Sequence, residues 1–533
     1  MTMSFRDTSK KILGTLPLTA EIDWYLRGRS RTSIGRFSLK RLSENLPGMV
    51  DQVMPHAENA PAGRKVFIFA TLHFWIQHAA VTSLALAGLG HKVTLVYLPF
   101  GDFSKPINRF DLQRQNIYAR SSLKKASPLV RCISLLDVHP AARLPENLRS
   151  SVEKVCLYDA QYILQTEQVN GDEPVYQLRR SRNMNAARRA LALLKKDRPE
   201  VVIIPNGMIQ EFGAFYETAR SLDIPVVTYE FGEQDQRVWL GQNRLVMFHD
   251  TDDLWAVRKH RQLGTKQRTW LEKFIASRQG MQRGDRFAHL WQTASPEGGV
   301  KTRASLGLDD RPIVLLPTNV MGDSATLGRT LISGTISEWV AGVVKFFAER
   351  PQVQLVIRVH PAESKSVGPS IVDVIRRSVP NLPGHIHVIG AMEKINTYDL
   401  IEICDLALVF TTTAGLEICT RGIPVAVSGR AHYRGKGFTL DAESWDEYFS
   451  KLDKLLVNLS AQRLTPEQVE AAWNYTYAFF NEYPRPFPWH IEHLWPGLEK
   501  RPLSHVLGDT GRREYERTFQ ELAGKTMEWK DEF

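Results

Sequence analysis

The sequence predicts two doubly wound, Rossmann-like α/β domains in tandem, each built on a parallel sheet. Short apolar runs alternate with helix-length segments, first between residues 65 and 230 and again between residues 313 and 427. Runs such as Val66–Ala70 are continuously apolar, as expected of parallel strands that are covered on both faces. The strand–helix–strand order implies right-handed crossovers. A chain of 533 residues is also too long for one ordinary core.

The N-terminal domain is predicted to span residues 63–277. Its expected strands are Val66–Ala70, Val93–Leu98, Val201–Pro205 and Ile224–Tyr229. Its expected helices are His73–Gly88 and Met208–Ser221, and Gly88 suits the C-terminal turn of the first. The stretch from about residue 109 to residue 198 is basic and mostly helical in pattern, so we interpret it as an insertion.

The C-terminal domain is predicted to span residues 308–445, after a polar, glycine-containing linker at 278–307. Its expected strands are Ile313–Leu316, Leu355–Val359, Ile386–Ile389, Leu406–Phe410 and Val425–Val427. Its expected helices are Ile336–Glu349, Ile371–Ser378, Thr397–Cys404 and Gly415–Arg421. Residues 446–533 are predicted to form C-terminal helices and a charged tail. The two domains are expected to hold a ligand in the cleft between them.

Composition excludes several classes of protein. With 43% hydrophobic and 24% charged residues, the chain has ordinary globular values. Its four cysteines form no CxxC pair, which favours a reducing compartment over a disulfide or zinc framework. The sequence has no apolar run of about 18 residues and no signal-peptide core. We therefore expect a cytoplasmic protein.

The basic excess is concentrated near the N-terminus. The whole chain carries 68 Lys and Arg against 58 Asp and Glu, a formal charge of +10. Residues 1–50 hold nine basic and four acidic side chains, so half of that charge lies in the first 50 residues of a predicted basic helical arm, residues 1–62. This arm is either a solvated appendage or a peripheral contact with anionic lipid at the inner face of the membrane. Nucleic acid is the least favoured partner, because no binding motif for it is present.

Because the carboxyl ends of parallel strands face the ligand, reactive side chains are expected directly after each strand. The strand Leu355–Val359 is followed by His360 and Pro361, and it contains Arg358. Pro361 fixes the turn and would hold the His360 imidazole at the cleft. There the imidazole could donate to a phosphate or transfer a proton. A capping histidine in an ordinary turn is the alternative.

The strand Leu406–Phe410 is followed by three hydroxyl residues, Thr411–Thr413, and then by Gly415. Free backbone N–H groups at the start of the next helix, together with threonine hydroxyls, form a pocket that suits a phosphate. Glu417 lies in the first helical turn. It either satisfies the helix N-terminus or binds the hydroxyls of a ribose.

Two further strand ends carry charged residues. The strand Ile224–Tyr229 leads to Glu230, which could deprotonate a hydroxyl if burial raises its pKa; a solvent-facing loop acid is the alternative. The loop after Val425–Val427 contains Arg434 and Lys436, which could contact a phosphate or an anionic sugar.

Three weaker features have ordinary structural explanations. Asp250-Thr251-Asp252 matches a bare metal-binding Asp-x-Asp pattern, but acids just before Leu254-Trp255 favour a helix start, and we prefer that interpretation. His73 and His78 lie early in the first crossover, where an acceptor could approach, and a packing role is the equal alternative for both. Arg329 follows the strand Ile313–Leu316 and could reach a ligand. No GxxxxGK[ST] sequence is present, so a P-loop nucleotide hydrolase is not expected.

Four segments together resemble the capsule polysaccharide biosynthesis proteins, the Kdo-transferase-like group of GT-B glycosyltransferases, and they occur in the family's order. Glu230-Phe231-Gly232 is similar to the acidic-x-Gly motif, and Arg358–Pro361 is similar to the His-Pro motif. Phe410–Glu417 resembles the Ser/Thr-rich phosphate loop, and Tyr433–Thr439 resembles the Tyr-x-x-x-Gly-x-Thr segment. The resemblance covers roughly residues 200–445. It departs from the family at Phe231, where a second acid is common.

The resemblance implies a metal-independent glycosyltransferase that moves a sugar from a nucleotide-sugar donor to a surface or capsular polysaccharide. A CMP-linked acidic sugar is the favoured donor, with a UDP-linked sugar as the alternative. The nucleotide sugar is a substrate, so no cofactor is expected. The implied catalytic residues are Glu230 and His360, and Glu233 is a rival base. The implied donor-binding residues are Arg358, Thr411, Thr412, Thr413, Gly415, Glu417, Tyr433 and Lys436, and the acceptor-binding residues are His73 and Glu233.

Two other functions stay open. A sugar-nucleotide epimerase or hydrolase can share this architecture and would need no second substrate. A non-catalytic scaffold of an envelope glycan assembly complex would need neither Glu230 nor His360.

Overall fold

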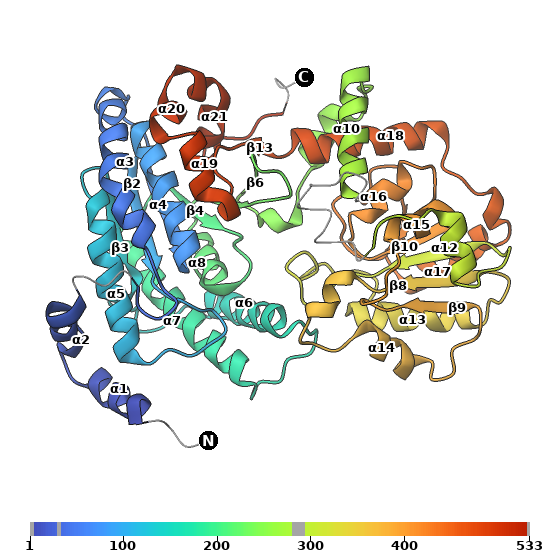
Figure 1. Cartoon of the computed structure of the whole chain (residues 1–533), viewed down its shortest axis with the longest axis horizontal. Coiled ribbons are helices and arrows are strands. Elements are labelled where there is room, and N and C mark those ends of the chain that lie inside the picture. The colour runs from blue at the N-terminus through green and yellow to red at the C-terminus, as the bar shows by residue number, and fades with distance from the viewer. Residues whose placement is uncertain (1–4, 29–32, 280–293, 530–533) are drawn as a thin grey trace. The chain divides into compact units, whose positions relative to one another are not determined.

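The computed structural model describes residues 5–28, 33–279 and 294–529, and it divides the chain into two compact units (Figure 1). Unit 1 contains residues 1–160, 170–249 and 484–528. Unit 2 contains residues 161–169, 250–483 and 529–533. Each unit is an α/β body around a largely parallel sheet, which confirms the predicted fold class.

The sheet of unit 1 has the order β13-β6-β5-β4-β1-β2-β3. Its strands are β1 (Lys65–Thr71), β2 (Lys92–Leu98), β3 (Val130–Ser134), β4 (Val201–Pro205), β5 (Val226–Glu230), β6 (Arg237–Gln242) and β13 (Arg485–Pro486). The strands β1 to β5 are parallel, with Val66 opposite both Val93 and Val201. Strand β6 runs antiparallel to β5, and β13 runs antiparallel to β6. The first five strands therefore have the Rossmann order 3-2-1-4-5.

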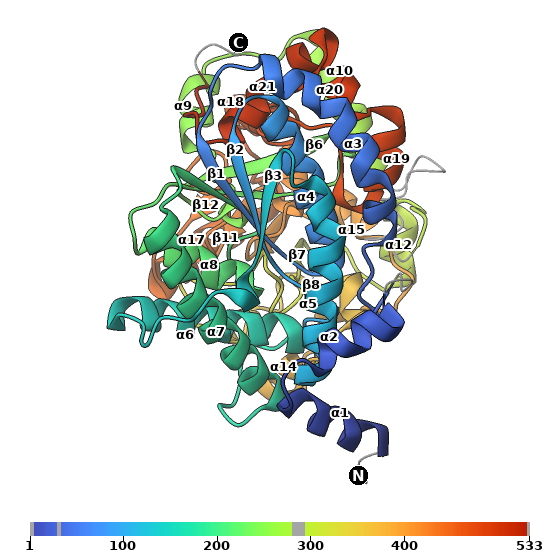
Figure 2. The same ribbon diagram turned by 90° about the vertical axis from the view of Figure 1, so that its left-hand side faces the viewer.

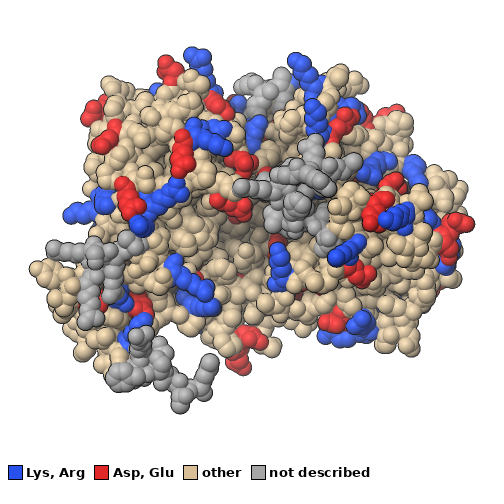
Figure 3. Space-filling model, in the orientation of Figure 1, with Lys and Arg blue, Asp and Glu red and all other residues tan. Residues whose placement is uncertain are grey.

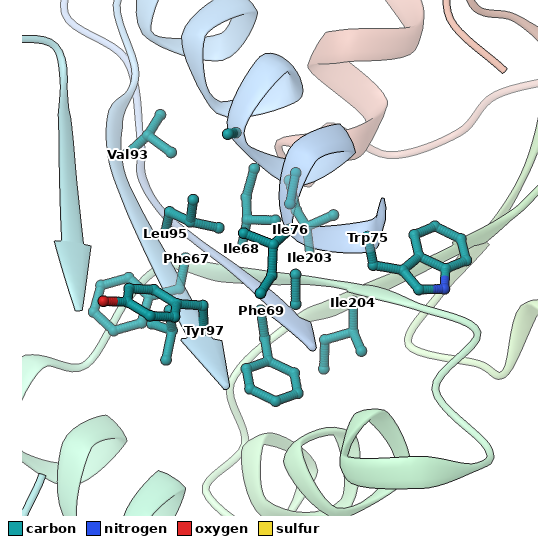
Figure 4. Close-up of a cluster of buried hydrophobic side chains, with 14 of the residues drawn as sticks. Phe67, Ile68, Phe69, Trp75, Ile76, Val93, Leu95, Tyr97, Ile203 and Ile204 are labelled. Atoms are coloured by element: carbon teal, nitrogen blue, oxygen red, sulfur yellow. The ribbon is translucent and has the colours of Figure 1, made fainter. Parts of the chain in front are cut away.

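Helices cover both faces of this sheet. They are α3 (Lys40–Asn59), α4 (His73–Gly88), α5 (Arg109–Leu123), α6 (Glu146–Leu164), α7 (Pro174–Asp197), α8 (Gln210–Arg220), α19 (Leu494–Lys500), α20 (Leu503–Leu507) and α21 (Asp509–Leu522). Successive side chains of β1 point to opposite faces: Figure 4 shows Ile68 on the side of α4 with Ile76, and Phe69 on the other side. There Phe69 stacks on Phe215 of α8, with ring centroids 4.4 Å apart. The continuous apolar run of β1 is thus explained by burial on two sides.

The sheet of unit 2 has the order β12-β11-β10-β7-β8-β9, and all its strands are parallel. They are β7 (Ile313–Pro317), β8 (Gln354–Arg358), β9 (Ile386–Ile389), β10 (Leu406–Val409), β11 (Val425–Val427) and β12 (Leu440–Asp441). The helices are α9 (Asp252–Arg258), α10 (Thr265–Arg278), α12 (Gly299–Ser305), α13 (Ile336–Ala348), α14 (Ile371–Ser378), α15 (Thr397–Ile403), α16 (Ala414–Cys419), α17 (Trp445–Leu456) and α18 (Pro466–Tyr477). Read along the chain, this is the full Rossmann order 3-2-1-4-5-6.

The course of the chain differs from the predicted domain boundaries in three places. Strand β3 lies inside the stretch 109–198, which was expected to be mostly helical. The chain passes from unit 1 to unit 2 at residues 249–250, and residues 484–528 return to unit 1, where β13 extends the sheet. Within the predicted linker, residues 280–293 lie outside the described residues. The linker also contains α12, which packs so closely on α15 that a Cβ on Gly299 would lie 2.4 Å from Ile403.

No helix in the described ranges is both long enough and apolar enough to span a bilayer. Figure 3 shows lysine and arginine side chains interspersed with acidic ones over the face that it draws. The cations on this face are therefore not gathered into one field of the kind that tracks a nucleic-acid backbone.

A buried ion network fastens three helices of unit 1 together. The fully buried Arg179 guanidinium on α7 contacts Asp159 of α6 at 2.6 Å and Glu211 of α8 at 2.9 Å. Asn183 adds a 2.8 Å hydrogen bond to Asp159. Burial raises the pKa of Asp159, and the Arg179 charge opposes that rise. Because Glu211 lies in the first turn of α8, the network also fixes the start of the helix that follows β4.

We predict that Arg179→Met lowers the free energy of unfolding of unit 1 by about 3–5 kcal/mol, because it leaves two carboxylates buried without a cation. The matched control is Arg180→Met, since Arg180 pairs with Glu153 on the partly exposed side of the same helix. The control is expected to cost less than about 1 kcal/mol. Urea unfolding followed by circular dichroism measures both values. Equal losses for the two variants would contradict the assignment of Arg179 as the structural cation.

Candidate functional site

The strand order of unit 2 reverses beside β7, which pairs with β8 on one side and β10 on the other. In an open α/β sheet, a ligand crevice forms outside the carboxyl ends of the strands at this point. Two hydrogen bonds tie these strand ends together. The His360 N–H after β8 donates to the Thr318 hydroxyl at 3.0 Å, and the Thr411 N–H after β10 donates to the Asn319 side chain at 3.3 Å. Sequence reasoning did not predict a role for Thr318 or Asn319.

His360 is held as a neutral hydrogen-bond donor. Its Nδ1 accepts a 3.1 Å hydrogen bond from the Ala362 N–H at the start of the 3₁₀ turn Pro361–Lys365, so the ring proton is assigned to Nε2. Burial, reinforced by the nearby Arg358 charge, lowers the pKa of His360 to about 4. The capping role expected as an alternative is therefore present, with Nδ1 as the acceptor and the ring proton on Nε2. At neutral pH this imidazole suits donation to a phosphate oxygen better than acid catalysis.

Arg358 is buried, and its guanidinium donates hydrogen bonds to backbone carbonyl oxygens. It donates to the carbonyl oxygen of Gly390 at 2.6 Å and to that of Glu393 at 3.4 Å, just beyond β9. These contacts join the ends of β8 and β9. They also keep a positive charge close to His360, which contributes to the lowered pKa of that residue.

The loop Thr411–Thr413 leads from β10 into α16, as the sequence predicted. In the described part of the chain, the N–H groups of Thr412 and Thr413 have no hydrogen-bond acceptor. The Thr411 side chain is buried and donates to the Ala325 carbonyl at 3.4 Å, whereas Thr412 and Thr413 are half-buried. Unpaired N–H groups before a helix, with hydroxyls beside them, can bind an anion.

Tyr433 and Gly415 are coupled by a close approach. The Tyr433 hydroxyl donates to the Thr412 carbonyl at 2.6 Å, so the buried ring supports the loop from behind. A Cβ on Gly415 would lie 2.5 Å from that hydroxyl oxygen, which explains why only glycine fits there. Both residues were predicted as donor-binding; here they shape the loop that exposes the N–H groups.

Glu417 forms an ion pair that sequence reasoning missed. Its Oε1 lies 2.9 Å from Nε of Arg278 at the end of α10, and Arg278 also donates to the Thr413 hydroxyl at 3.3 Å. Glu417 is fully buried, and its Oε2 has no hydrogen-bond partner within the described residues. One carboxylate oxygen is therefore used by Arg278, and the other is the group that could meet a ribose hydroxyl.

The basic loop after β11 is largely engaged within unit 2. Arg434 donates to the Ala442 carbonyl at 2.7 Å and to Glu443 at 2.6 Å. Lys436 is buried and forms a short ion pair with Asp252. Asp252 is the first residue of α9, so the acids of the Asp-x-Asp pattern do lie at a helix start.

In unit 1, Glu230 is the last residue of β5 and is half-buried. Its two carboxylate oxygens accept hydrogen bonds from the Phe231 N–H at 3.0 Å and from the Asn206 side chain at 3.2 Å. Burial raises the pKa of Glu230, and these two hydrogen bonds oppose the rise. Asn206, which directly follows β4, has φ +55° and was not predicted from the sequence. The pair Glu230–Asn206 therefore joins the ends of two neighbouring strands.

The other predicted residues of unit 1 have different environments. His73 is half-buried and begins α4 directly after Leu72, whose φ of +64° marks a strained turn at the end of β1. Its Nδ1 is buried with no hydrogen-bond partner in the described chain. His78 is a core residue: its Nε2 lies 3.2 Å from the Trp489 carbonyl, and burial lowers its pKa to about 3. Glu233 is half-buried in the bend beyond Gly232.

The structure also bears on two other predictions, the role of Arg329 and the absence of a metal site. Arg329 is buried in the loop after β7, and burial lowers its pKa to about 10. Among the described residues, no group of three or more His, Cys, Asp or Glu side chains is arranged to hold a metal ion. The expectation of a metal-free reaction stays a prediction.

We predict that Gly415→Ala destabilises unit 2 by about 1–3 kcal/mol, because the new methyl group must displace the Tyr433 ring. Gly384→Ala is the matched control, since a Cβ there would meet nothing within 4 Å. Thermal unfolding followed by circular dichroism measures the difference. If both variants unfold at the same temperature, the close approach of Tyr433 does not constrain this position.

Comparison with known proteins supports the resemblance for unit 2. Residues 297–462 match the family model described as capsule polysaccharide biosynthesis protein. The matched stretch includes His360, Thr411–Thr413, Glu417 and Tyr433–Thr439, whereas Glu230 lies outside it. No curated protein matches the chain.

Solved structures give weak similarities. The KpsC β-Kdo 2,4-transferase of Thermosulfurimonas dismutans is 16% identical, with 62% of this chain and 88% of that chain covered and a TM-score of 0.37. The β-Kdo 2,7-transferase of KpsC from the same organism is 15% identical, with 53% and 79% covered and a TM-score of 0.31. A UDP-GlcNAc 2-epimerase from Neisseria meningitidis is 11% identical, with 78% and 100% covered and a TM-score of 0.25. At these TM-scores the similarities carry no argument about activity. Over residues 297–462 the chain matches the capsule polysaccharide biosynthesis proteins, which confirms the resemblance that its motifs predicted.

Proposed function

We propose that this protein is a glycosyltransferase of capsule or surface polysaccharide synthesis, which moves a sugar from a nucleotide-sugar donor to a glycan acceptor. One observation carries the proposal: the stretch that matches the family, residues 297–462, contains the strand ends after β8 and β10 with their hydrogen-bond donors. The family resemblance favours a CMP-linked acidic sugar, with a UDP-linked sugar as the alternative. The nucleotide sugar is consumed as a substrate, and we propose no cofactor or metal ion.

In this proposal unit 2 binds the donor through neutral groups. The N–H groups of Thr412 and Thr413 and the Nε2–H of His360 donate hydrogen bonds to the nucleotide phosphate. As the bond from the anomeric carbon to the phosphate oxygen breaks, that oxygen takes the electron pair, and fixed donors stabilise the new charge. Because His360 is neutral, it stabilises the leaving group without giving up its proton.

Glu230 is the proposed base for the acceptor. Its carboxylate takes the proton from the attacking hydroxyl while the hydroxyl oxygen bonds to the anomeric carbon. A raised pKa makes the carboxylate a stronger base than an exposed one, provided that it is ionised at the working pH. Glu233 is the rival base, and His73 at the start of α4 is proposed to contact the acceptor.

The proposal predicts transfer from one class of donor, and only when an acceptor glycan is present. Purified protein is incubated with CMP-, UDP- and GDP-sugars, with and without acceptor, and the products are identified by mass spectrometry. His360→Ala is expected to lower kcat by about 10²–10³-fold, because one donor to the leaving phosphate is lost. The matched control is His387→Ala, in the middle of β9, which is expected to keep its rate.

Three outcomes separate the alternatives. Epimerised or hydrolysed donor in the absence of acceptor would favour the epimerase or hydrolase. If none of the donors is consumed, the non-catalytic scaffold is favoured. If Glu233→Gln loses transfer and Glu230→Gln keeps it, Glu233 is the catalytic base.

We also predict that Asn206 sets the acid limb of the pH–rate profile. Its hydrogen bond favours the ionised form of Glu230, so removing it should raise the pKa of Glu230 further. In Asn206→Gly, which tolerates the positive φ, the acid limb is expected to move about one pH unit upward. Asn185→Ala, on the surface of α7, is the control and should leave the profile unchanged. A lower rate with an unmoved acid limb would mean that Asn206 only holds the backbone turn.

A further inference from the structure

We propose that His490 is a positioning residue for Glu230, the base of the proposed transfer. His490 lies in residues 484–528, which come back to unit 1 and which we call the return segment. In both Figure 1 and Figure 2, helix α20 of this segment lies beside α3 and α4. The proposal rests on the proposed function, because it takes Glu230 as the base. It adds a role for a part of the chain that the sequence predicted only as C-terminal helices.

Backbone pairing brings the start of the return segment to the loop after β5. Strand β13 pairs with β6, and the Phe487 N–H then donates to the Gln236 carbonyl oxygen at 2.9 Å. Trp489 is fully buried, and its carbonyl oxygen lies 3.2 Å from Nε2 of His78 on α4. The chain is thus fixed on both sides of β5 before it reaches His490, which is itself buried.

His490 is held in one tautomer. Its Nδ1 accepts a hydrogen bond from the Glu492 N–H at 3.3 Å, so the ring proton is assigned to Nε2. Nε2 donates that proton to the carbonyl oxygen of Gly232 at 3.2 Å. Burial lowers the pKa of His490, and the hydrogen bond to Gly232 opposes this, so the ring is neutral at neutral pH. Of the charged groups around it, Glu492 and Asp235 raise this pKa and His493 lowers it.

Phe231, the middle residue of the acidic-x-Gly motif, is packed among aromatic rings. Its ring centroid lies 4.9 Å from that of His490 and 6.0 Å from that of Phe487, both in the return segment. The ring centroids of Trp75 and His78 on α4 lie 6.2 and 5.0 Å away. A second acid at this position would place a charge among these rings, which is costly. The packing therefore explains why this chain departs from the family at Phe231.

The turn is fixed on one more side by Trp239 of β6. A Cβ on Gly232 would lie 2.6 Å from the Trp239 ring, so the backbone of this residue lies directly against that ring. His490 holds the same residue by its carbonyl oxygen. Phe231 and Gly232 are therefore held by side chains of α4, β6 and the return segment together.

The fixed turn acts on Glu230 through one backbone group. The Phe231 N–H donates to Oε1 of Glu230 at 3.0 Å, so the orientation of the peptide between them helps to set the direction of the carboxylate. Burial raises the pKa of Glu230, and this hydrogen bond opposes the rise. If the turn loosens, the carboxylate loses its direction and is protonated more easily.

The test compares two substitutions that separate the ring of His490 from its hydrogen bond. His490→Phe keeps a ring against Phe231 and removes the Nε2–H donor, whereas His490→Gln supplies an amide N–H in place of that donor. His490→Leu also lacks the donor and serves if the larger phenyl ring prevents folding. The matched control is His505→Phe, at an exposed position on α20.

The first readout is the pKa of Glu230 itself, which needs no transferase activity. Each full-length variant is labelled with carbon-13 at its glutamate carboxyl carbons and titrated by NMR, and the Glu230 signal is identified by its absence in Glu230→Gln. In His490→Phe this pKa is expected to rise by about 0.5–1 pH unit, because the hydrogen bond from Phe231 weakens. It is expected to return toward its original value in His490→Gln and to stay unchanged in His505→Phe.

The second readout is transfer. In His490→Phe, kcat is expected to fall about tenfold or more while the KM for the donor stays the same, and His490→Gln should recover most of the rate. An unchanged pKa of Glu230 in both His490→Phe and His490→Leu would overturn the proposal. A raised pKa together with full transfer in Glu230→Gln would instead contradict Glu230 as the base, and would leave His490 as the residue that holds it.

Discussion

The pairing of β7 with both β8 and β10 is the constraint on which the candidate site depends. Strand β8 follows β7 through one crossover, whereas β10 lies on the other side of β7 and comes later in the chain. In open α/β sheets, ligands bind outside the carboxyl ends of the strands at such a reversal of strand order. Thr318 and Asn319, directly after β7, hydrogen-bond to the loop on either side and keep both loops in place. Without this strand order, His360 and Thr411 would not both hydrogen-bond to residues directly after β7.

The groups that we propose for binding the phosphate are neutral. Arg358, Arg434 and Lys436 were the cations that sequence reasoning placed at the site, but their described contacts are with carbonyl oxygens and carboxylates of unit 2. Backbone N–H groups and a neutral imidazole can stabilise an anion without the large cost of burying an unpaired cation. Net charge was therefore a poor guide to the ligand, and half of it belongs to residues 1–50, which are far along the chain from these strands.

Much of the fold was predictable, because buried parallel strands have continuous apolar sequences. The strands β1, β2, β4, β7, β8, β9, β10 and β11 lie within a few residues of their predicted positions. Strand β3 was missed because Val130–Ser134 is mixed in polarity and only partly buried. The return of residues 484–528 to unit 1 depends on pairing between β13 and β6. Because these strands are more than 240 residues apart, no local sequence pattern predicts the pairing.

The candidate site was predictable in part. His360, Glu230 and the threonine loop lie at the carboxyl ends of strands, so their position in the sequence was enough to predict them. Asn206, Arg278 and Thr318 were missed because each acts through a partner that is distant in sequence. The most direct test of the account is a crystal structure with the donor nucleotide bound. We expect the phosphate within hydrogen-bond distance of the Thr412 and Thr413 N–H groups and of His360 Nε2. A nucleotide phosphate bound away from the carboxyl ends of β8 and β10 would contradict it.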